Sequence, residues 1–374
     1  MKYDRKKITT ILIMLSSFII CGLSSAAFSE NNKKVTQEEF KALKKKVRKL
    51  KKSVNQLEQD LSSVLDAQLP ESVNINCDAG DSISTELTRY VNSSSPLTLN
   101  ISGTCIENIV VSRSNVTFNG TDASAGLEAL DPNIALFAVS RGAGNIQVND
   151  LNFNGGLYGL IAAKGSQLSI NRSDISLATF GVVSVDSSSV EVSQSRIHDN
   201  TNSGVLANIN GTMTIRDNTT VELNATGVVS QTGGTVYLTS TRSDGSSGTG
   251  VTITANNTGI AAASGSIVQV RDSSVSGNSN VGFYIVTNSV LHFLTTENGS
   301  GNTISNQNIG IYSLKNTSVT FADTNNTFNN NSTFALYCHP TTAYMVSNGP
   351  GTLPGAFSGN GPGGASDVIN CSDF

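Results

Sequence analysis

The sequence lacks tryptophan and is poor in aromatic and charged residues, which make up 6% and 14% of its 374 residues. Only three histidines and seven prolines are present. Lysine is almost missing from residues 71–374, which contain just Lys164 and Lys315. Nucleic-acid binding needs clustered lysine and arginine on a folded surface. The sequence therefore argues against a nucleic-acid partner.

The net charge of −4 conceals three unlike segments. Residues 1–27 contain four basic residues and one acidic residue, and residues 28–70 contain ten and six. Residues 71–374 contain ten basic and twenty-one acidic residues. A chain with a basic start and an acidic body is expected to contain segments with separate roles.

The first segment is typical of an export signal. Four basic residues precede the apolar run 8–20, and small residues at 24–27 offer a cleavage site near Ala27. We expect residues 1–27 to be a signal peptide, and the mature protein to be secreted, displayed at the cell surface or kept in the periplasm. Cys21 leaves lipid modification as an alternative. We expect no transmembrane segment after signal cleavage, because no later stretch is long and apolar enough.

Residues 38–65 contain an unbroken heptad pattern of apolar residues, with spacings that alternate between three and four. We expect a coiled coil within residues 28–70 and a homo-oligomer formed through residues 38–65, because so narrow an apolar seam needs a partner. Pro70 ends the helix. The seam positions are Phe40, Leu43, Val47, Leu50, Val54, Leu57, Leu61 and Val64.

The order and orientation of this oligomer stay open. Valine at one core position and leucine at the other favour two parallel strands. In a parallel pair, however, Lys46 faces Lys51 of the partner. An antiparallel pair brings Lys46 toward Asp60 instead, and it also brings Lys44 toward Glu58. A parallel trimer is a third arrangement.

The same helix contains a concentrated basic patch. This patch is either a solvated helix exterior or a surface that docks on an anionic cell-envelope polymer such as lipopolysaccharide. Its residues are Lys41, Lys44, Lys45, Lys46, Arg48, Lys49, Lys51 and Lys52.

The body repeats, and the repeat is visible once its glycines are aligned. One strand recurs at intervals of 22 to 32 residues, starting at Gly159, Gly181, Gly204, Gly227, Gly259, Gly282, Gly310 and Ala335. A second strand recurs in step with it, starting at Ile146, Leu168, Val190, Met213, Val236, Val268, Leu291 and Val319. Each coil of the chain is therefore expected to contain at least two short strands of alternating polarity.

Asparagine recurs three or four residues before the aligned glycine or alanine. It tolerates left-handed turns, and its amide can bond to the copies above and below, which predicts a ladder. Stacking such coils at about 4.8 Å creates a continuous interior of valine, isoleucine and leucine. The asparagines are Asn200, Asn224, Asn256, Asn278, Asn306 and Asn331.

These coils of ~23 residues, such as DSSVSGNSNVGF from Asp272, resemble right-handed parallel β-helix repeats of the pectate-lyase-like superfamily over about residues 95–340. The resemblance implies an all-β fold, a single-stranded right-handed parallel β-helix over residues 71–374. Caps are expected at residues 71–110 and 341–374, the first with a short helix over residues 81–90. The superfamily includes lyases, hydrolases, epimerases, adhesins and phage fibres, so the resemblance selects no activity.

Two coils are enlarged at the same turn, at residues 240–250 and 297–302. Long loops commonly hold function. A flank with carboxylates and guanidinium groups would bind an acidic sugar, abstract a proton or hydrolyse a glycosidic bond. The alternative function is therefore a polysaccharide lyase, hydrolase or epimerase acting on an acidic polysaccharide. The catalytic candidates are Arg216, Asp217, Arg242, Asp244, Arg271, Asp272 and Glu297.

Several features argue against catalysis. The polygalacturonase-type set resembles Asn-x-Asp, Asp-Asp, Gly-His-Gly and Arg-x-Lys, and this set is incomplete because Asp-Asp and Gly-His-Gly are missing, as is a dense acidic cluster for calcium. Asp150, Arg172, Asp217 and Asp272 fall at one stacked position and also fit charge spacers on an exposed turn. The sequence favours a non-enzymatic protein for adhesion, glycan binding or structural display, with a glycan or cell-envelope polymer as partner.

An apolar column supplies the binding candidates. The second residue after each aligned glycine should point outward, because strand side chains alternate. The column ends in three tyrosines, which suit a sugar ring or a neighbouring protomer unless the chain itself covers them or they only stack on one another. It consists of Ile161, Val183, Leu206, Val229, Ala261, Tyr284, Tyr312 and Tyr337.

Four cysteines remain once the signal is removed, and an even number in an exported chain predicts disulfides. In an elongated body we expect the local pairs Cys77–Cys105 and Cys338–Cys371, each closing one end. No close Cys-x-x-Cys is present, and His339 beside Cys338 stands alone. The sequence therefore predicts no metal site, and we expect no cofactor.

Overall fold

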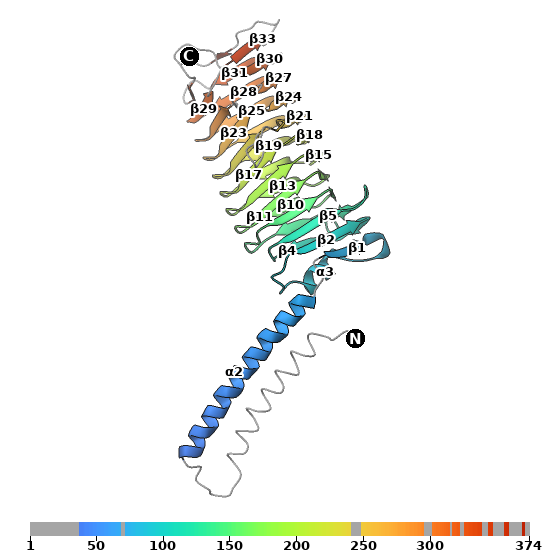
Figure 1. The fold of residues 1–374 in the computed structure, drawn as a ribbon. Coiled ribbons are helices and arrows are strands. Elements are labelled where there is room, and N and C mark those ends of the chain that lie inside the picture. Colours follow the sequence, from blue (N-terminus) through green and yellow to red (C-terminus); the bar gives the residue numbers. More distant parts are fainter. Residues whose placement is uncertain are drawn as a thin grey trace. The chain divides into compact units, whose positions relative to one another are not determined.

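The computed structural model describes residues 37–68, 72–240, 248–294, 301–314, 316–321, 325–338, 343–346, 355–358 and 369–370. The chain divides into two units, Met1–Gln68 and Leu69–Phe374. Helix α2 (Gln37–Gln68) belongs to the first unit, and the parallel strands belong to the second (Figure 1).

Helix α2 is continuous over 32 residues and contains the heptad pattern. Four apolar side chains of the seam are 41–64% exposed, namely Leu43, Val47, Leu50 and Leu57. Among the helices in the described part of the chain, none is long and apolar enough to cross a membrane. The structure shows a helix with an open seam, and the coiled coil and the oligomer stay predictions.

The second unit contains three long parallel sheets. Sheet A has the strand order β1 (Ser72–Asn76), β2 (Leu97–Ser102), β5 (Val116–Gly120), β8 (Ile146–Asn149), β11 (Gln167–Asn171), β14 (Ser189–Ser193), β17 (Thr212–Arg216), β20 (Thr235–Thr239), β23 (Ile267–Arg271), β26 (Val290–Leu294), β29 (Thr317–Phe321), β32 (Ala343–Val346). Sheet B has the order β3 (Thr104–Ile106), β6 (Gly126–Glu128), β9 (Asn152–Asn154), β12 (Asp174–Ser176), β15 (Arg196–His198), β18 (Thr220–Glu222), β21 (Thr252–Thr254), β24 (Ser274–Ser276), β27 (Thr303–Ser305), β30 (Asn326–Asn329), β33 (Gly355–Ser358). Sheet C has the order β4 (Ile109–Val111), β7 (Phe137–Val139), β10 (Tyr158–Ala162), β13 (Phe180–Ser184), β16 (Ser203–Ala207), β19 (Thr226–Ser230), β22 (Thr258–Ala262), β25 (Val281–Val286), β28 (Ile309–Leu314), β31 (Phe334–Cys338), β34 (Ile369–Asn370).

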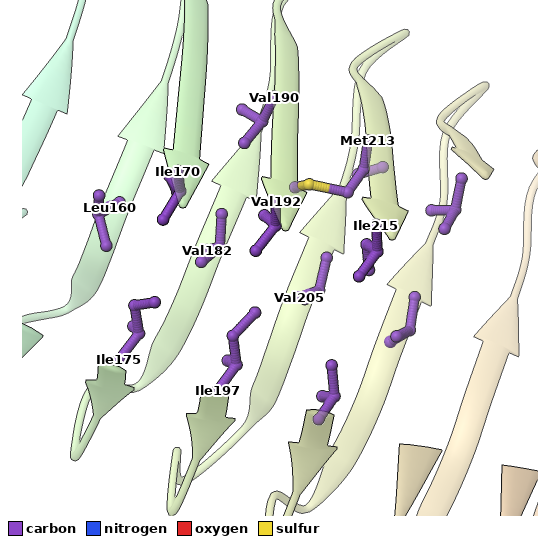
Figure 2. Packing of buried hydrophobic residues seen from close by; sticks show 14 of the residues in the cluster. Leu160, Ile170, Ile175, Val182, Val190, Val192, Ile197, Val205, Met213 and Ile215 are labelled. Atoms are coloured by element: carbon purple, nitrogen blue, oxygen red, sulfur yellow. The ribbon is translucent and has the colours of Figure 1, made fainter. Parts of the chain in front are cut away.

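Successive coils stack in register, so that each strand pairs with its copy in the next coil. Val190 of β14 pairs with Met213 of β17, for example, and both side chains are fully buried. Figure 2 shows how side chains from all three sheets point into one interior, which alternation along each strand dictates. This is the right-handed parallel β-helix that the repeats predict, and the fold class is confirmed.

The predicted asparagine ladder is confirmed over four coils. Asn200 Nδ2 donates to Asn224 Oδ1 at 2.9 Å, and buried amides continue the row through the next two coils. At the following coil the prediction is wrong, because Gln307 rather than Asn306 accepts from Asn278. Asn306 instead takes a left-handed backbone with φ 58°. The longer glutamine side chain reaches the ladder from the next position along the chain.

The amino-terminal end of the solenoid is closed by a short helix, α3 (Ile83–Arg89), which follows the 3₁₀ turn η1 (Cys77–Ala79). The backbone amides of Ile83 and Ser84 donate to the Glu107 carboxylate, which satisfies the start of the helix. Three side chains of this segment are buried as expected, namely Ile83, Leu87 and Tyr90.

A disulfide joins Cys77 and Cys105 at this end, as predicted, with their Cα atoms 4.9 Å apart. Buried Arg113 adds a second tie, since its Nη1 donates to the backbone oxygen of Tyr90 at 2.8 Å. The expected partner of Cys338, Cys371, lies outside the described residues. The pairing Cys338–Cys371 therefore stays a prediction.

Candidate functional site

The residues predicted for the enlarged flank lie at the turn from sheet A to sheet B. Arg216 ends β17 and Arg271 ends β23. Each is followed by an aspartate with a left-handed backbone, with φ 51° at Asp217 and 46° at Asp272. The remaining candidates lie outside the described residues; they are Arg242, Asp244 and Glu297.

Asp272 connects the two enlarged turns. Its Oδ2 accepts a hydrogen bond from the Ser240 hydroxyl at 2.9 Å, and its Oδ1 accepts one from the Gly301 amide at 3.1 Å. Ser240 lies one coil before Asp272, and Gly301 lies one coil after it. The two carboxylate oxygens thus bind a side chain of one neighbouring coil and the backbone of the other, which favours a structural role for Asp272.

The stacked charges at this turn divide into two environments. Arg172 and Asp150 form an exposed bidentate ion pair, with both N–O distances at 2.7 Å. This pair fits the interpretation of charge spacers on an exposed turn. Asp217 is instead buried, at 6% exposure. An exposed spacer is therefore the wrong description of Asp217.

Asp217 belongs to a hollow of about 450 Å³ on the outer face of sheet A. Arg216 lies in its wall, where Nε donates to Glu191 Oε1 at 2.7 Å and Nη1 lies 3.2 Å from Asp217 Oδ2. The Arg216 side chain is only 13% exposed. Its charge is therefore held between two carboxylates, those of Glu191 and Asp217.

Polar side chains of three successive coils complete this first hollow. They are amides and hydroxyls, which donate to and accept from sugar hydroxyls. They include Gln147, Asn149, Ser169, Asn171, Ser193 and Gln194.

A second hollow of about 220 Å³ follows along the same face. Tyr237 of β20, Gln269 of β23 and Arg271 line it. Tyr237 pairs in register with Gln269, and Gln269 pairs with His292 of β26. The two hollows meet at β17, which gives Arg216 to the first and Thr214 to the second.

His292 differs from an ordinary surface histidine. Its side chain is half-buried, and desolvation lowers the pKa of the imidazole below its usual value of 6.5. The ring is therefore neutral at neutral pH and has a nitrogen lone pair available to accept a proton. Its place beside Gln269 puts this base next to the second hollow.

The enlarged turns gave no indication that the outward residues of sheet A form a candidate site. Glu191, Tyr237, Gln269 and His292 are the middle residues of their strands and share one outward column. Alternation along each strand was the signal that would have found them, because the flanking residues on both sides are buried.

The tyrosine column of sheet C is outward, as predicted, and its rings stack. Tyr284 and Tyr312 have ring centroids 5.6 Å apart, and Tyr312 and Tyr337 have centroids 4.7 Å apart. Burial raises the pKa of the Tyr312 phenol, and the neighbouring Tyr337 and Tyr284 raise it further. Rings stacked in this way present their edges, and the outer ring Tyr284 is 38% exposed.

The aliphatic part of the column is less open than expected. Val183 and Leu206 are 1% and 7% exposed, although neither belongs to the interior cluster. Val183 pairs with Ile161 on one side and with Leu206 on the other. Large aliphatic side chains stacked at the strand spacing shield one another. Tyr284 is therefore the most exposed member of the stripe.

Sheet B has a charged cluster on its outer face, around His198. The His198 Nε2 lies 2.9 Å from Asp174 Oδ1, and its Nδ1 lies 2.6 Å from Asp199 Oδ2. Arg196 on the same strand pairs with Glu222 at 2.7 Å. Across the described parts of the chain, no three histidine, cysteine or acidic residues gather in a way that would hold a metal ion.

The sequence matches no protein-family model and no curated protein. Among solved structures, the fold is similar to the A-module of the mannuronan C-5 epimerase AlgE6 of Azotobacter vinelandii, with 13% identity, a TM-score of 0.50, and 80% of this chain and 96% of that chain covered. The A-module of AlgE4 from the same organism gives 11% identity, a TM-score of 0.47 and coverage of 75% and 90%. The Dettilon tailspike protein has 12% identity and a TM-score of 0.37, with 75% of this chain and 69% of that chain covered. At such identities the likeness is one of fold, and the second unit of this chain has a parallel β-helix fold.

Proposed function

We propose that this protein is an exported β-helix protein that binds a linear polysaccharide along the outer face of sheet A, for adhesion or display. The supporting observation is that two hollows follow one another on this face, from β8 to β26. At the usual strand spacing of about 4.8 Å, these seven strands span roughly 30 Å. A groove of that length suits a chain molecule rather than a single sugar.

The chemistry of the first hollow favours a neutral, hydroxyl-rich chain. The Arg216 charge is already compensated by Glu191 and Asp217, so little positive charge is left to attract a uronate carboxylate. Carboxylates and amides are good partners for sugar hydroxyls. The acidic body of the protein, residues 71–374, also disfavours a polyanion.

Two further observations are consistent with an extracellular glycan ligand. The Cys77–Cys105 disulfide fits an oxidising compartment. The fold is similar to that of a module whose name describes action on mannuronan. On sheet C, the ring edges of Tyr284, Tyr312 and Tyr337 offer a separate surface for a glycan or a neighbouring protomer.

The second hollow supports an alternative function, a polysaccharide lyase or epimerase. Such reactions remove a proton from a carbon next to a carboxylate, which calls for a neutral base, a cation and a proton donor. His292, Arg271 and Tyr237 are groups of these three kinds on three successive strands around Gln269. A hydrolase is less favoured, because Glu191 and Asp217 both bind Arg216.

A panel of neutral and acidic polysaccharides separates the two functions. The purified protein is tested for retention of each polymer and for three products: reducing ends, unsaturated ends, and deuterium taken up from D2O at the carbon next to the carboxylate, which reports epimerisation without chain cleavage. Retention without product supports binding. Product release that is lost in Tyr237→Phe and His292→Gln supports the enzyme instead. If no polymer is retained or changed, the proposal of a glycan ligand is wrong.

A further inference from the structure

Helix α2 exposes an apolar seam that a partner must cover. Leu43, Val47, Leu50 and Leu57 are 41%, 46%, 50% and 64% exposed. They recur at intervals of three, four and seven residues, so they form one stripe along the helix. A stripe this narrow matches the seam of a coiled coil rather than a surface that packs on a sheet.

The charge on this helix is polarised along its length. Residues 41–52 contain eight basic residues and no acidic one, whereas residues 53–60 contain Glu58 and Asp60 and no basic one. Two such helices in parallel place like charges side by side. In antiparallel orientation, the basic half of each helix lies beside the acidic part of the other.

The seam permits antiparallel pairing without a gap. A two-fold axis at residue 52 places Leu50 opposite the partner's Val54, and Val47 opposite the partner's Leu57. In these two central layers one valine meets one leucine. Towards both ends of the seam apolar residues also face apolar residues, because the 3,4 spacing is symmetric about this point.

The positions that flank the seam decide between the two orientations. Antiparallel pairing places Lys44 beside the partner's Glu58, and Lys46 beside the partner's Asp60, and each contact occurs twice. Its one like-charge contact is Lys51 with the partner's Lys51. Antiparallel pairing therefore gives four attractive contacts and one repulsive contact.

Parallel pairing gives a poorer balance of attractive and repulsive contacts between charged side chains. It brings Lys46 beside the partner's Lys51 twice. Its attractive flanking contacts are those between Glu39 and the partner's Lys44 near the start of the helix, which also occur twice. Attraction and repulsion are then equal in number, and the basic halves of the two helices lie side by side.

We propose that α2 pairs with α2 of a second copy of this chain as an antiparallel dimer. The partner is identified by the complementary charges and by the two-fold symmetry of the seam. Each chain continues from the end of α2 into its own solenoid, so the two solenoids attach at opposite ends of the paired helices. With the glycan-binding face proposed above on each solenoid, a dimer of this kind would bind one polymer at two places and gain avidity.

Lys46→Glu tests the orientation in the full chain, because its effect has opposite signs in the two dimers. In the antiparallel dimer the new glutamate faces the partner's Asp60, and we expect the dimer dissociation constant to rise by about tenfold. In a parallel dimer or trimer it faces the partner's Lys51, and association becomes tighter. Sedimentation equilibrium measures the constant, and far-UV circular dichroism confirms that the protein is folded.

Two further variants complete the test. Lys45→Glu makes the same charge change on the outer side of the helix and is expected to leave the dissociation constant unchanged within about twofold. Lys46→Glu with Asp60→Lys exchanges the charges of the pair and is expected to restore wild-type association. A monomeric wild type, a trimer, unchanged or tighter association of Lys46→Glu, or no rescue by the double variant overturns the proposal.

Discussion

The side chains of Asn224 and Asn256 are joined across two adjacent coils. The Asn224 Nδ2 donates to Asn256 Oδ1 at 3.1 Å, and the Asn224 backbone amide donates to the same oxygen at 2.9 Å. Asn256 itself is 1% exposed, and its Nδ2 donates to the Thr254 backbone oxygen at 2.9 Å. The Asn256 oxygen thus satisfies the buried backbone amide of Asn224, which would otherwise lack a partner.

Replacing this amide should destabilise the solenoid. Asn256→Ala leaves the buried backbone amide of Asn224 without its acceptor and removes the donor to the Val221 and Thr254 backbone oxygens, so we expect the free energy of unfolding to fall by about 3 kcal/mol. Urea denaturation followed by circular dichroism measures the change. Asn257→Ala, at the exposed neighbouring position, is the control and should cost less than about 1 kcal/mol. Equal effects of the two variants would show that the ladder contributes little.

Filling the first hollow should abolish glycan retention without affecting the fold. Ser169 is an exposed residue in the middle of β11 and lines the hollow. In Ser169→Trp the indole occupies space meant for the ligand, and we expect affinity for the retained polysaccharide to fall at least tenfold. Thr254→Trp, on the outer face of sheet B, makes a comparable change away from the groove. Loss of retention in both variants, or in neither, would contradict this assignment.

The Cys77–Cys105 disulfide should stabilise the amino-terminal end more than the rest of the solenoid. It closes a loop with a sequence separation of 28. Removing a disulfide that closes such a loop typically lowers the free energy of unfolding by about 3 kcal/mol. In Cys105→Ser we expect faster hydrogen exchange in residues 72–111. Exchange in residues 189–239 should change little, because coils contact only their neighbours. Uniform acceleration along the chain would argue against local stabilisation.

His292 should make stability depend on pH. Because burial lowers the pKa of His292 in the folded protein, the unfolded chain binds the proton first as pH falls below 6.5. The free energy of unfolding is therefore greatest above pH 6.5. It decreases as the pH is lowered, and it levels off once the pH is below the pKa of His292 in the folded protein. Unfolding midpoints at pH 8 and pH 5 should differ less in His292→Gln than in wild type. An equal difference would exclude His292 as the cause.

The fold was readable from the sequence because every coil repeats the same physical requirements. Buried positions such as Val190 and Met213 alternate with outward ones, and the Asn200 column marks the turns. The sequence did not predict that Gln307 takes the place of Asn306 in the ladder. A glutamine one position later reaches the same bonds because its side chain is longer.

The site was less predictable than the fold. Asp272 is a catalytic candidate in the sequence because long loops lie beside it. In the structure, however, its carboxylate binds Ser240 and Gly301. The hollows on sheet A arise from outward residues such as Tyr237 and Gln269, which are distant in sequence and meet only through register. A sequence motif would have to include residues from several coils to reveal them.

Titration with size-graded oligosaccharides of the retained polysaccharide tests the central claim most directly. If one chain lies along both hollows, affinity should rise with oligosaccharide length and level off once the sugar spans roughly 30 Å. The gain from the longer oligosaccharides should disappear in Gln269→Trp, which fills the second hollow. Affinity that is independent of length, or unchanged in both Ser169→Trp and Gln269→Trp, would contradict a polysaccharide groove on sheet A.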